Sequence, residues 1–99
     1  MRTIELGRTG ERVSQLALGC MNMGSLTDEA TSFAILDRYV EAGGTFLDTA
    51  NCYTWWNERG SLGGHSESLL GRWFARTGRR DEVFLATKAG AQMRDVDLM

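Results

Sequence analysis

Short apolar runs alternate with helical patterns along most of this chain, and this alternation restricts the possible folds more than any other feature. Residues 16–20, 45–50 and 83–88 have the length and apolar character of buried strands. Residues 28–42 and a segment that starts at Ser66 have the spacing of amphipathic helices. Buried strands separated by helices are typical of a parallel sheet with helices packed on it, so we expect an α/β fold.

The ends of both predicted helices carry recognisable signals. Thr27 has the residue type of an N-cap for the first helix, and Gly43 follows its last turn. Ser66 has the same residue type at the start of the second helix. The predicted apolar sides consist of Ala30, Phe33, Leu36 and Val40 in the first helix, and of Leu69, Leu70, Trp73 and Phe74 in the second.

The segment before the first strand predicts a β-hairpin over residues 2–14, with Gly7 and Gly10 at its turn. The element order is therefore hairpin, β, α, β, α, β, which fits both an open sheet and a barrel. The turn after the first strand, residues 19–24, does not have the G-x-G-x-x-G pattern. This absence disfavours the dinucleotide-binding fold of open sheets.

Composition excludes several function classes. The net charge of −2 gives no basic surface for nucleic acid, and no apolar run approaches the ~20 residues that cross a bilayer. Cys20 and Cys52 are the two cysteines, and no secretion signal precedes them, so we expect reduced thiols in a cytoplasmic protein. Lys88 is the single lysine beside ten arginines, which invites a chemical role for it.

Three chemically active residues meet at one end of the predicted sheet. Asp48 and Lys88 lie near the carboxyl ends of two strands, and Tyr53 follows Asp48 on the next loop. A free tyrosine has a pKa near ~10, and a neighbouring ammonium stabilises its phenolate. The trio could therefore donate a proton to a carbonyl oxygen. Taken singly, each residue has a structural explanation: Asp48 could accept turn amides, Tyr53 could pack, and Lys88 could extend to solvent.

The same segments resemble the aldo-keto reductase superfamily. Residues 6–10 and 13–19 resemble the family's floor hairpin and first barrel strand. Residues 43–53 resemble its segment with the catalytic Asp and Tyr, and residues 83–88 resemble its strand with the catalytic Lys. Residues 66–71 resemble the start of its second helix. The resemblance implies reversible hydride transfer between NADP(H) and an aldehyde or ketone. It implies that Tyr53 is the general acid/base, Lys88 its charged partner and Asp48 the support of Lys88.

The resemblance also places Gly19, Cys20 and Met21, with Asp48, beside the nicotinamide. Trp55 and Trp56 follow Tyr53 on a long loop, where we expect them to contact the small-molecule carbonyl substrate together with Tyr53. The fourth catalytic residue of the family is a His on the following strand. His65 precedes Lys88 and cannot be that residue. We expect His65 to be an exposed loop residue, and we expect no metal site, because Cys52 and Glu67 lack ligand spacing.

A complete (β/α)8 barrel needs ~250 residues. We therefore expect a single incomplete domain over residues 1–99, with the floor hairpin in 1–14 and the first three strands and two helices in 15–99. The 99-residue chain alone should then be inactive and should associate through its open strand edges, whereas the oligomeric state of a complete barrel is not predictable. Two alternatives stay open: a non-catalytic truncated barrel that serves as a binding or partner subunit, and a Schiff-base aldolase that uses Lys88 as a nucleophile.

Overall fold

The computed structural model describes residues 1–56 and 61–91. The strands are β1 (Thr3–Glu5), β2 (Arg12–Ser14), β3 (Leu18–Gly19), β4 (Phe46–Asp48) and β5 (Phe84–Ala86); the helices are α1 (Glu29–Glu41), α2 (His65–Thr77) and a short 3-10 turn, η1 (Arg80–Glu82). The predicted order of hairpin, β, α, β, α, β is confirmed. Of the last eleven residues, which show no clear sequence period, 92–99 lie outside the described part of the chain.

A parallel sheet in the order β3-β4-β5 forms the centre of the fold. Its register pairs Gly19 with Asp48, and Asp48 with Ala86. The carboxyl ends of all three strands therefore lie at one edge of the sheet, which is where active sites form in α/β proteins.

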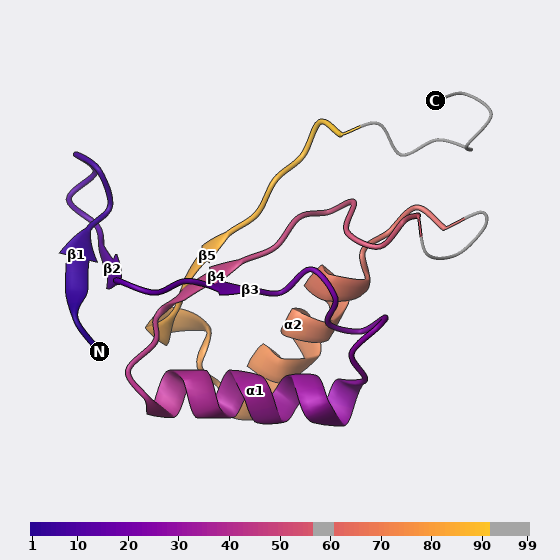
Figure 1. The fold of residues 1–99 in the computed structure, drawn as a ribbon, viewed down its shortest axis with the longest axis horizontal. Coiled ribbons are helices and arrows are strands. Elements are labelled where there is room, and N and C mark those ends of the chain that lie inside the picture. Colours follow the sequence, from indigo (N-terminus) through magenta and orange to yellow (C-terminus); the bar gives the residue numbers. More distant parts are fainter. Residues whose placement is uncertain (57–60, 92–99) are drawn as a thin grey trace.

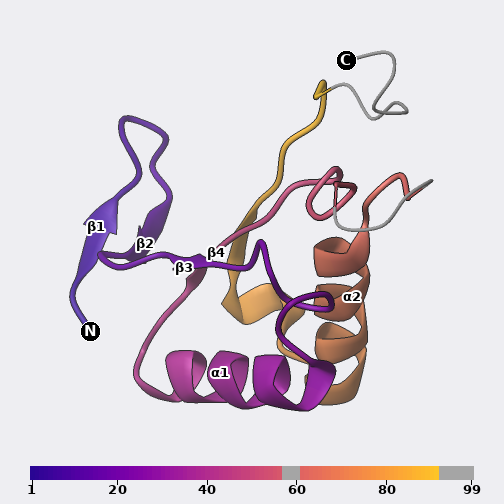
Figure 2. The same cartoon turned by 45° about the vertical axis from the view of Figure 1, so that its right-hand side comes forward.

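Helices α1 and α2 cover one face of this sheet (Figures 1 and 2). Leu36 of α1, Leu47 of β4, and Leu69 and Trp73 of α2 are fully buried in the core between them. The Trp73 indole N–H donates to the Asp37 carboxylate at 2.9 Å, which links the two helices. Among the described helices, none combines the length and the apolar character that spanning a membrane requires.

The opposite face of the sheet carries large side chains that neither α1 nor α2 covers, and residues 1–56 and 61–91 contain no other α-helix. Phe46 and Phe84 meet there edge to face, with ring centroids 5.6 Å apart, and both rings are half-buried. Because side chains alternate along a strand, Asp48 lies on this same face, two residues beyond Phe46. The face that carries the aromatic pair therefore also carries the catalytic candidates.

The β1-β2 hairpin lies at the amino ends of the sheet strands, away from the loops that follow β4 and β5 (Figures 1 and 2). Ser14 and Thr45 exchange hydrogen bonds there: the Ser14 amide donates to Thr45 Oγ1 at 2.9 Å and the Thr45 amide to Ser14 Oγ at 3.0 Å. The Tyr39 hydroxyl of α1 lies 2.9 Å from Ser14 Oγ and accepts from the Phe46 amide at 3.1 Å. The hairpin is thus fixed to the sheet and to α1.

Both predicted N-caps are wrong. Asp28, not Thr27, caps α1, because its carboxylate accepts the Thr31 amide at 2.7 Å. Helix α2 begins at His65, after Gly64 with φ 91°, and Ser66 is a helical residue whose hydroxyl points into the core. In α1, the Asp28 carboxylate is the group that reaches the first-turn amide. In α2, the turn at Gly64 takes the place of a side-chain cap, because glycine adopts positive φ without strain.

Three predicted apolar positions are exposed, namely Leu16, Ala17 and Ala30. Ala30 lies in the first turn of α1 and faces solvent, whereas Phe33, Leu36 and Val40 pack on the core as expected. In the predicted strand 16–20, only Leu18–Gly19 pairs with β4, and Leu16 is 64% exposed. Strand β3 is an edge of the described sheet, so only one side of it gains a neighbour.

Candidate active site

Lys88 lies just beyond the carboxyl end of β5, and its ammonium reaches across to β4. The amine donates to Asp48 Oδ1 at 2.7 Å and to the Thr49 carbonyl at 2.7 Å. Two backbone bonds hold the strand ends in place: the Thr49 amide donates to Ala86 O at 2.8 Å, and the Asn51 amide donates to Lys88 O at 3.1 Å. The sheet ladder therefore continues to the point where the charged pair forms.

Tyr53 completes the cluster from the loop after β4. The Lys88 amine lies 5.1 Å from the centroid of the Tyr53 ring, within cation–π range. The Tyr53 hydroxyl lies 3.5 Å from Asp48 Oδ2, a long hydrogen bond. The sequence predicts that Asp48, Tyr53 and Lys88 meet at one end of the sheet, and the structure brings them together there.

The charged pair is half-buried. The side chain of Lys88 is 50% exposed and that of Asp48 is 42% exposed. The hydrogen bond that Lys88 donates to Asp48, and secondarily the one to Tyr53, raises the pKa of the Lys88 amine above its ordinary value. The amine therefore stays protonated at neutral pH. Because solvent reaches both groups, breaking the pair costs about 0–1 kcal/mol, far less than the loss of a fully buried pair.

The residue after Tyr53 has an unusual backbone. Thr54 has φ 71°, and no other non-glycine residue in 1–56 and 61–91 has positive φ. Its side chain is fully buried; the hydroxyl donates to Tyr53 O at 2.6 Å and lies 2.8 Å from His65 Nδ1. His65 is therefore not an exposed loop residue, as its sequence position suggests, but the first residue of α2 with a hydrogen bond to the loop that carries Tyr53.

The segment after β3 contributes open backbone to the same edge. Gly19 pairs with Asp48, and a Cβ added to it would meet nothing within 4 Å. Met21 is partly exposed, whereas the Cys20 thiol is buried in the core. Burial raises the pKa of Cys20 to about 12. The Cys20 thiol therefore faces the helices and not the cluster of Asp48, Tyr53 and Lys88.

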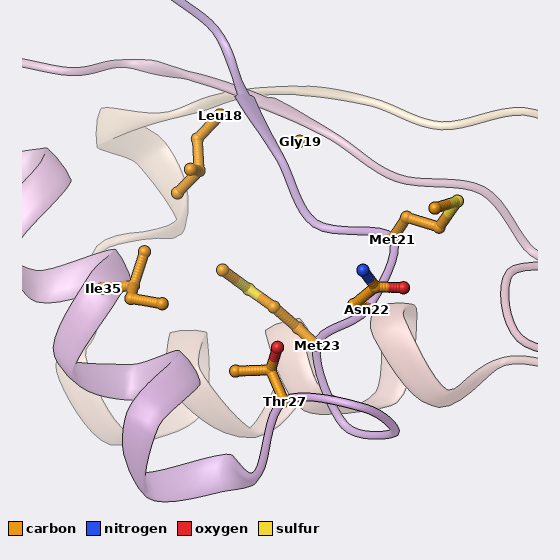
Figure 3. Close-up of a pocket in the computed structure, with 7 residues that line it drawn as sticks. All are labelled: Leu18, Gly19, Met21, Asn22, Met23, Thr27 and Ile35. Carbon is orange, nitrogen blue, oxygen red and sulfur yellow. The ribbon is translucent and has the colours of Figure 1, made fainter.

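A pocket of about 380 Å³ lies between this segment and α1. Leu18, Met23, Thr27 and Ile35 point toward its centre, and Asn22 lies at its rim (Figure 3). Gly19 and Met21 also line it, and its lining holds no acid or base. Asp48, Tyr53 and Lys88 are not among its lining residues.

Two tryptophans follow Tyr53 on the same loop. Trp55 and Trp56 pack edge to face with ring centroids 6.1 Å apart, and Trp56 is 49% exposed. The Trp55 amide donates to Cys52 O at 3.1 Å, which closes a turn under the rings. Asn51, at the start of this loop, has a buried Oδ1 with no hydrogen-bond partner in the described part of the chain.

Sequence reasoning missed three polar residues around the cluster. Thr49 provides the second acceptor for Lys88, Thr54 supports Tyr53, and Ser66 is buried between strand ends. Thr49 adjoins Asp48 and could have been included for that reason. The contacts of Thr54 and Ser66 depend on how α2 approaches the loops, and the chain contains no local signal for them.

The chain matches the Aldo/keto reductase family over residues 15–98. It is 50% identical over 91 residues to the uncharacterised oxidoreductase YrpG of Bacillus subtilis (strain 168), covering 91% of this chain and 27% of that protein. It is 40% identical over 95 residues to an uncharacterised 11.2 kDa protein of Pseudescherichia vulneris, covering 95% of this chain and 91% of that protein. The chain thus spans about a quarter of the first relative and most of the second.

A solved structure shows the same arrangement. The aldo-keto reductase AKR11C1 from Bacillus halodurans, in its holo form, superimposes with a TM-score of 0.76 at 35% sequence identity. The match covers 95% of this chain and 28% of that protein. The hairpin, sheet and two helices therefore form an α/β fold that resembles one part of such an enzyme.

Proposed function

The chain belongs to the Aldo/keto reductase family, and on this premise we propose that it carries the proton-donating part of a cytoplasmic NADP(H)-dependent carbonyl reductase. One observation carries the proposal: Lys88 bonds to Asp48 at 2.7 Å and lies 5.1 Å from the ring centre of Tyr53. The substrate class is a small aldehyde or ketone, which the reaction reduces to an alcohol.

In this proposal, strands β3, β4 and β5 are the first three of a (β/α)8 barrel, and the β1-β2 hairpin closes its floor. Two observations support it. The hairpin lies at the amino ends of the strands, and the likeness to the Bacillus halodurans enzyme includes 95% of the chain. The face with Phe46 and Phe84 would then be the barrel interior, where large side chains fill the core in layers.

Tyr53 is the proposed general acid. A carbonyl oxygen becomes basic as its carbon is reduced, and a phenol held within hydrogen-bond reach can protonate it. The hydride would come from a nicotinamide cofactor when one is bound. Lys88, held as an ammonium by Asp48, stabilises the negative charge that develops on the phenol oxygen when its proton leaves. Asp48 acts on Tyr53 mainly by keeping Lys88 in place and charged.

The residues present fit a nicotinamide ring near Asp48. Gly19 leaves open space beside the Asp48 backbone, and the unsatisfied Asn51 Oδ1 can accept a hydrogen bond at the same end of the sheet. We propose that Gly19 and Asp48 border the cofactor, together with the Met21 side chain. The buried thiol of Cys20 leaves only its backbone for such a contact.

The aldolase alternative requires a neutral lysine. A Schiff base forms when an unprotonated amine attacks a carbonyl. The neighbours of Lys88 raise its pKa and so keep the amine charged, and they provide no desolvated pocket around it. The geometry therefore favours a supporting role for Lys88 over a nucleophilic one.

A partner or binding subunit is the second candidate function. The observation that favours it is the Pseudescherichia vulneris relative, whose 11.2 kDa size is close to that of this chain. Such a subunit would bind without turnover. Activity measurements on a completed barrel and on this chain alone separate the two candidates.

The test uses a hybrid barrel, in which this chain replaces the matching 28% of the Bacillus halodurans enzyme. We expect the hybrid to oxidise NADPH when an aromatic aldehyde is added, and we expect stoichiometric alcohol as the product. The unmodified Bacillus enzyme is the control for folding and cofactor binding. The proposal is contradicted if the hybrid folds and binds NADPH but forms no alcohol from any aldehyde or ketone tested. Trapping of a carbonyl substrate on Lys88 by borohydride would instead support the aldolase alternative.

A further inference from the structure

Three consecutive residues at the start of α2 contact three different strand ends. His65, Ser66 and Glu67 point in directions roughly 100° apart, because an α-helix has about 3.6 residues per turn. Together their side chains hydrogen-bond to the segments that follow β3, β4 and β5. We refer to these three residues as the α2 clamp.

Ser66 joins the ends of β3 and β4. Its hydroxyl donates to Cys20 O at 2.7 Å and lies 2.7 Å from Thr49 Oγ1. Since the Ser66 proton is used toward Cys20, the Thr49 hydroxyl donates to Ser66. Ser66, Thr49 and Cys20 are all fully buried, so these bonds are shielded from water. Thr49 directly follows Asp48, and its carbonyl accepts from Lys88.

Glu67 holds the end of β5. The Thr87 hydroxyl donates to Glu67 Oε2 at 2.7 Å. Thr87 directly precedes Lys88, so this bond fixes the backbone from which the amine extends toward Asp48. The Lys88 side chain has four carbons and many rotamers, and a fixed backbone position restricts where its amine can lie.

His65 holds the loop after β4. The single proton of the Thr54 hydroxyl is donated to Tyr53 O at 2.6 Å, so Thr54 Oγ1 accepts from His65, whose Nδ1 carries the proton. Thr54 has φ 71°, a conformation that a β-branched residue rarely adopts. Such a backbone persists when its surroundings determine it, and the bond to His65 is one such determinant.

We propose that the α2 clamp is the positioning device of the candidate active site. One turn of a helix bonds to the residues that adjoin Asp48, Tyr53 and Lys88, and so sets the distances among these three groups. The inference rests on the proposed function for its consequence in catalysis. Its structural content, that α2 holds Lys88 against Asp48 and Tyr53, can be measured without any turnover.

Lys88 labelling measures the clamp directly. Lys88 is the single lysine, so the chain has two amines, Lys88 and the N-terminal Met1. Acetic anhydride in trace amounts reacts with the unprotonated amine, and peptide mass spectrometry gives the rate of Lys88 relative to Met1 in the full chain. Loss of contact with Asp48 lowers the pKa of Lys88 toward its ordinary value and increases the labelling ratio.

Two variants at Glu67 separate position from charge. In Glu67→Ala, Thr87 loses its acceptor, and we expect the Lys88 labelling ratio to rise roughly 3- to 10-fold, because the amine loses part of the contact with Asp48 that keeps it protonated. In Glu67→Gln, the amide oxygen still accepts from Thr87, so the ratio should stay near that of the unaltered chain. Glu29→Ala is the matched control, because Glu29 of α1 is an exposed carboxylate whose partner, Arg72, lies on α2 but away from the clamp.

The other two clamp residues are tested in the same way. We expect a higher ratio for His65→Ala and for Ser66→Ala, and rescue by His65→Asn, whose amide N–H can replace Nδ1–H. Ser66 is fully buried and its variant could unfold, whereas the half-buried His65 and Glu67 tolerate replacement better. Circular dichroism confirms the helix content of each variant, and the His65 and Glu67 pairs decide the result.

The proposal is overturned if Glu67→Ala and His65→Ala label like Glu29→Ala, or if Glu67→Gln labels as fast as Glu67→Ala. The second outcome would show that only the charge of Glu67 matters. In the hybrid barrel, the same alanine variants should lower kcat while NADPH affinity stays within about twofold. Labelling reports the position of the amine and the assay reports hydride transfer, so a failure of the proposed function and a failure of the clamp give different results.

Discussion

Among the described groups, Cys20 is the one whose pKa is raised most by folding. Its thiol is buried, and burial raises the pKa of Cys20 from 9.0 to about 12. The neutral thiol is the form that the folded state favours, so its contribution to stability is complete below pH 9 and is lost as the pH rises from 9 toward 12. We expect no alkylation of native Cys20 by iodoacetamide at pH 8.5, and rapid alkylation in guanidinium chloride.

Peptide mass spectrometry after timed alkylation checks this expectation. Cys52 is buried as well, so the chain unfolded in guanidinium chloride is the reference for reagent and digestion. Equal rates for native and unfolded Cys20 would show that the thiol is not in the core between β3 and the helices.

Trp55 and Trp56 should set substrate preference if they border the carbonyl site. Their rings pack on each other beside Tyr53, and Trp56 is half exposed, so large apolar surface is available to a ligand. We expect Trp55→Ala and Trp56→Ala in the hybrid barrel to change relative kcat/KM among aldehydes of different size more than NADPH affinity. Leu62→Ala, an exposed apolar position before α2, is the control. An unchanged substrate ranking would assign the two rings to loop packing alone.

For single residues, the sequence predicts the position of the charged pair better than it predicts hydrogen bonds between buried polar side chains. Asp48 and Lys88 could be placed together because parallel strands end at one edge and side chains alternate. The bond between Thr54 and His65 could not be predicted, because it requires a positive φ at a threonine and the approach of a helix from eleven residues further along the chain. A hydrogen bond of this kind becomes evident only when the position of α2 relative to the loop after β4 is known.

The junction of α1 and β4 depends on the absence of a side chain at Gly44. A Cβ at this position would overlap the Tyr39 ring, and the hydroxyl of that ring bonds to both the hairpin and β4. Displacing the ring breaks these bonds, so we expect Gly44→Ala to lower the free energy of unfolding by about 1–3 kcal/mol.

Gly71→Ala is the matched control for this prediction. Gly71 lies in α2, is exposed, and has open space where a Cβ would be. Alanine there should increase stability by about 0.5–1 kcal/mol, because glycine inside a helix is unfavourable. Thermal unfolding of both variants in the hybrid barrel gives the comparison, and a Gly44→Ala variant as stable as Gly71→Ala would show that Tyr39 does not pack as described.

The existence and order of the elements follow from the sequence, but several of their ends do not. Residues 28–42 and the segment from Ser66 are helical as predicted, because apolar side chains such as Leu36 and Trp73 recur on one side. The predicted caps at Thr27 and Ser66 are wrong, since Asp28 reaches the first-turn amide and Gly64 makes the other turn. The strand at 16–20 is shorter than expected because β3 pairs on one side only.

For the whole molecule, we expect the 99-residue chain alone to be inactive and to associate. The described sheet has two edges, β3 and β5, and Phe46 and Phe84 are only half-buried on its uncovered face. Leaving such side chains unburied forfeits about 1.5–3 kcal/mol each, and open edges pair with other chains. Size-exclusion chromatography should show oligomers, and NADPH with simple aldehydes should not be oxidised.

A monodisperse monomer that unfolds cooperatively and oxidises NADPH would contradict this expectation. It would mean that three strands and two helices suffice for both the fold and the chemistry. The hybrid barrel is the positive control, because it supplies the strands that follow the matching 28% of the Bacillus halodurans enzyme.

The most direct test of the account is the rate of carbonyl reduction by Tyr53→Phe in the hybrid barrel. Phenylalanine keeps the ring near Lys88 and removes only the hydroxyl, so NADPH affinity, measured by fluorescence titration, should be nearly unchanged. Proton donation of this kind contributes about 10²–10⁴-fold, and kcat should fall by a factor in that range. A variant with near-normal turnover would remove Tyr53 from the mechanism and contradict the assignment of this cluster as the proton-donating site.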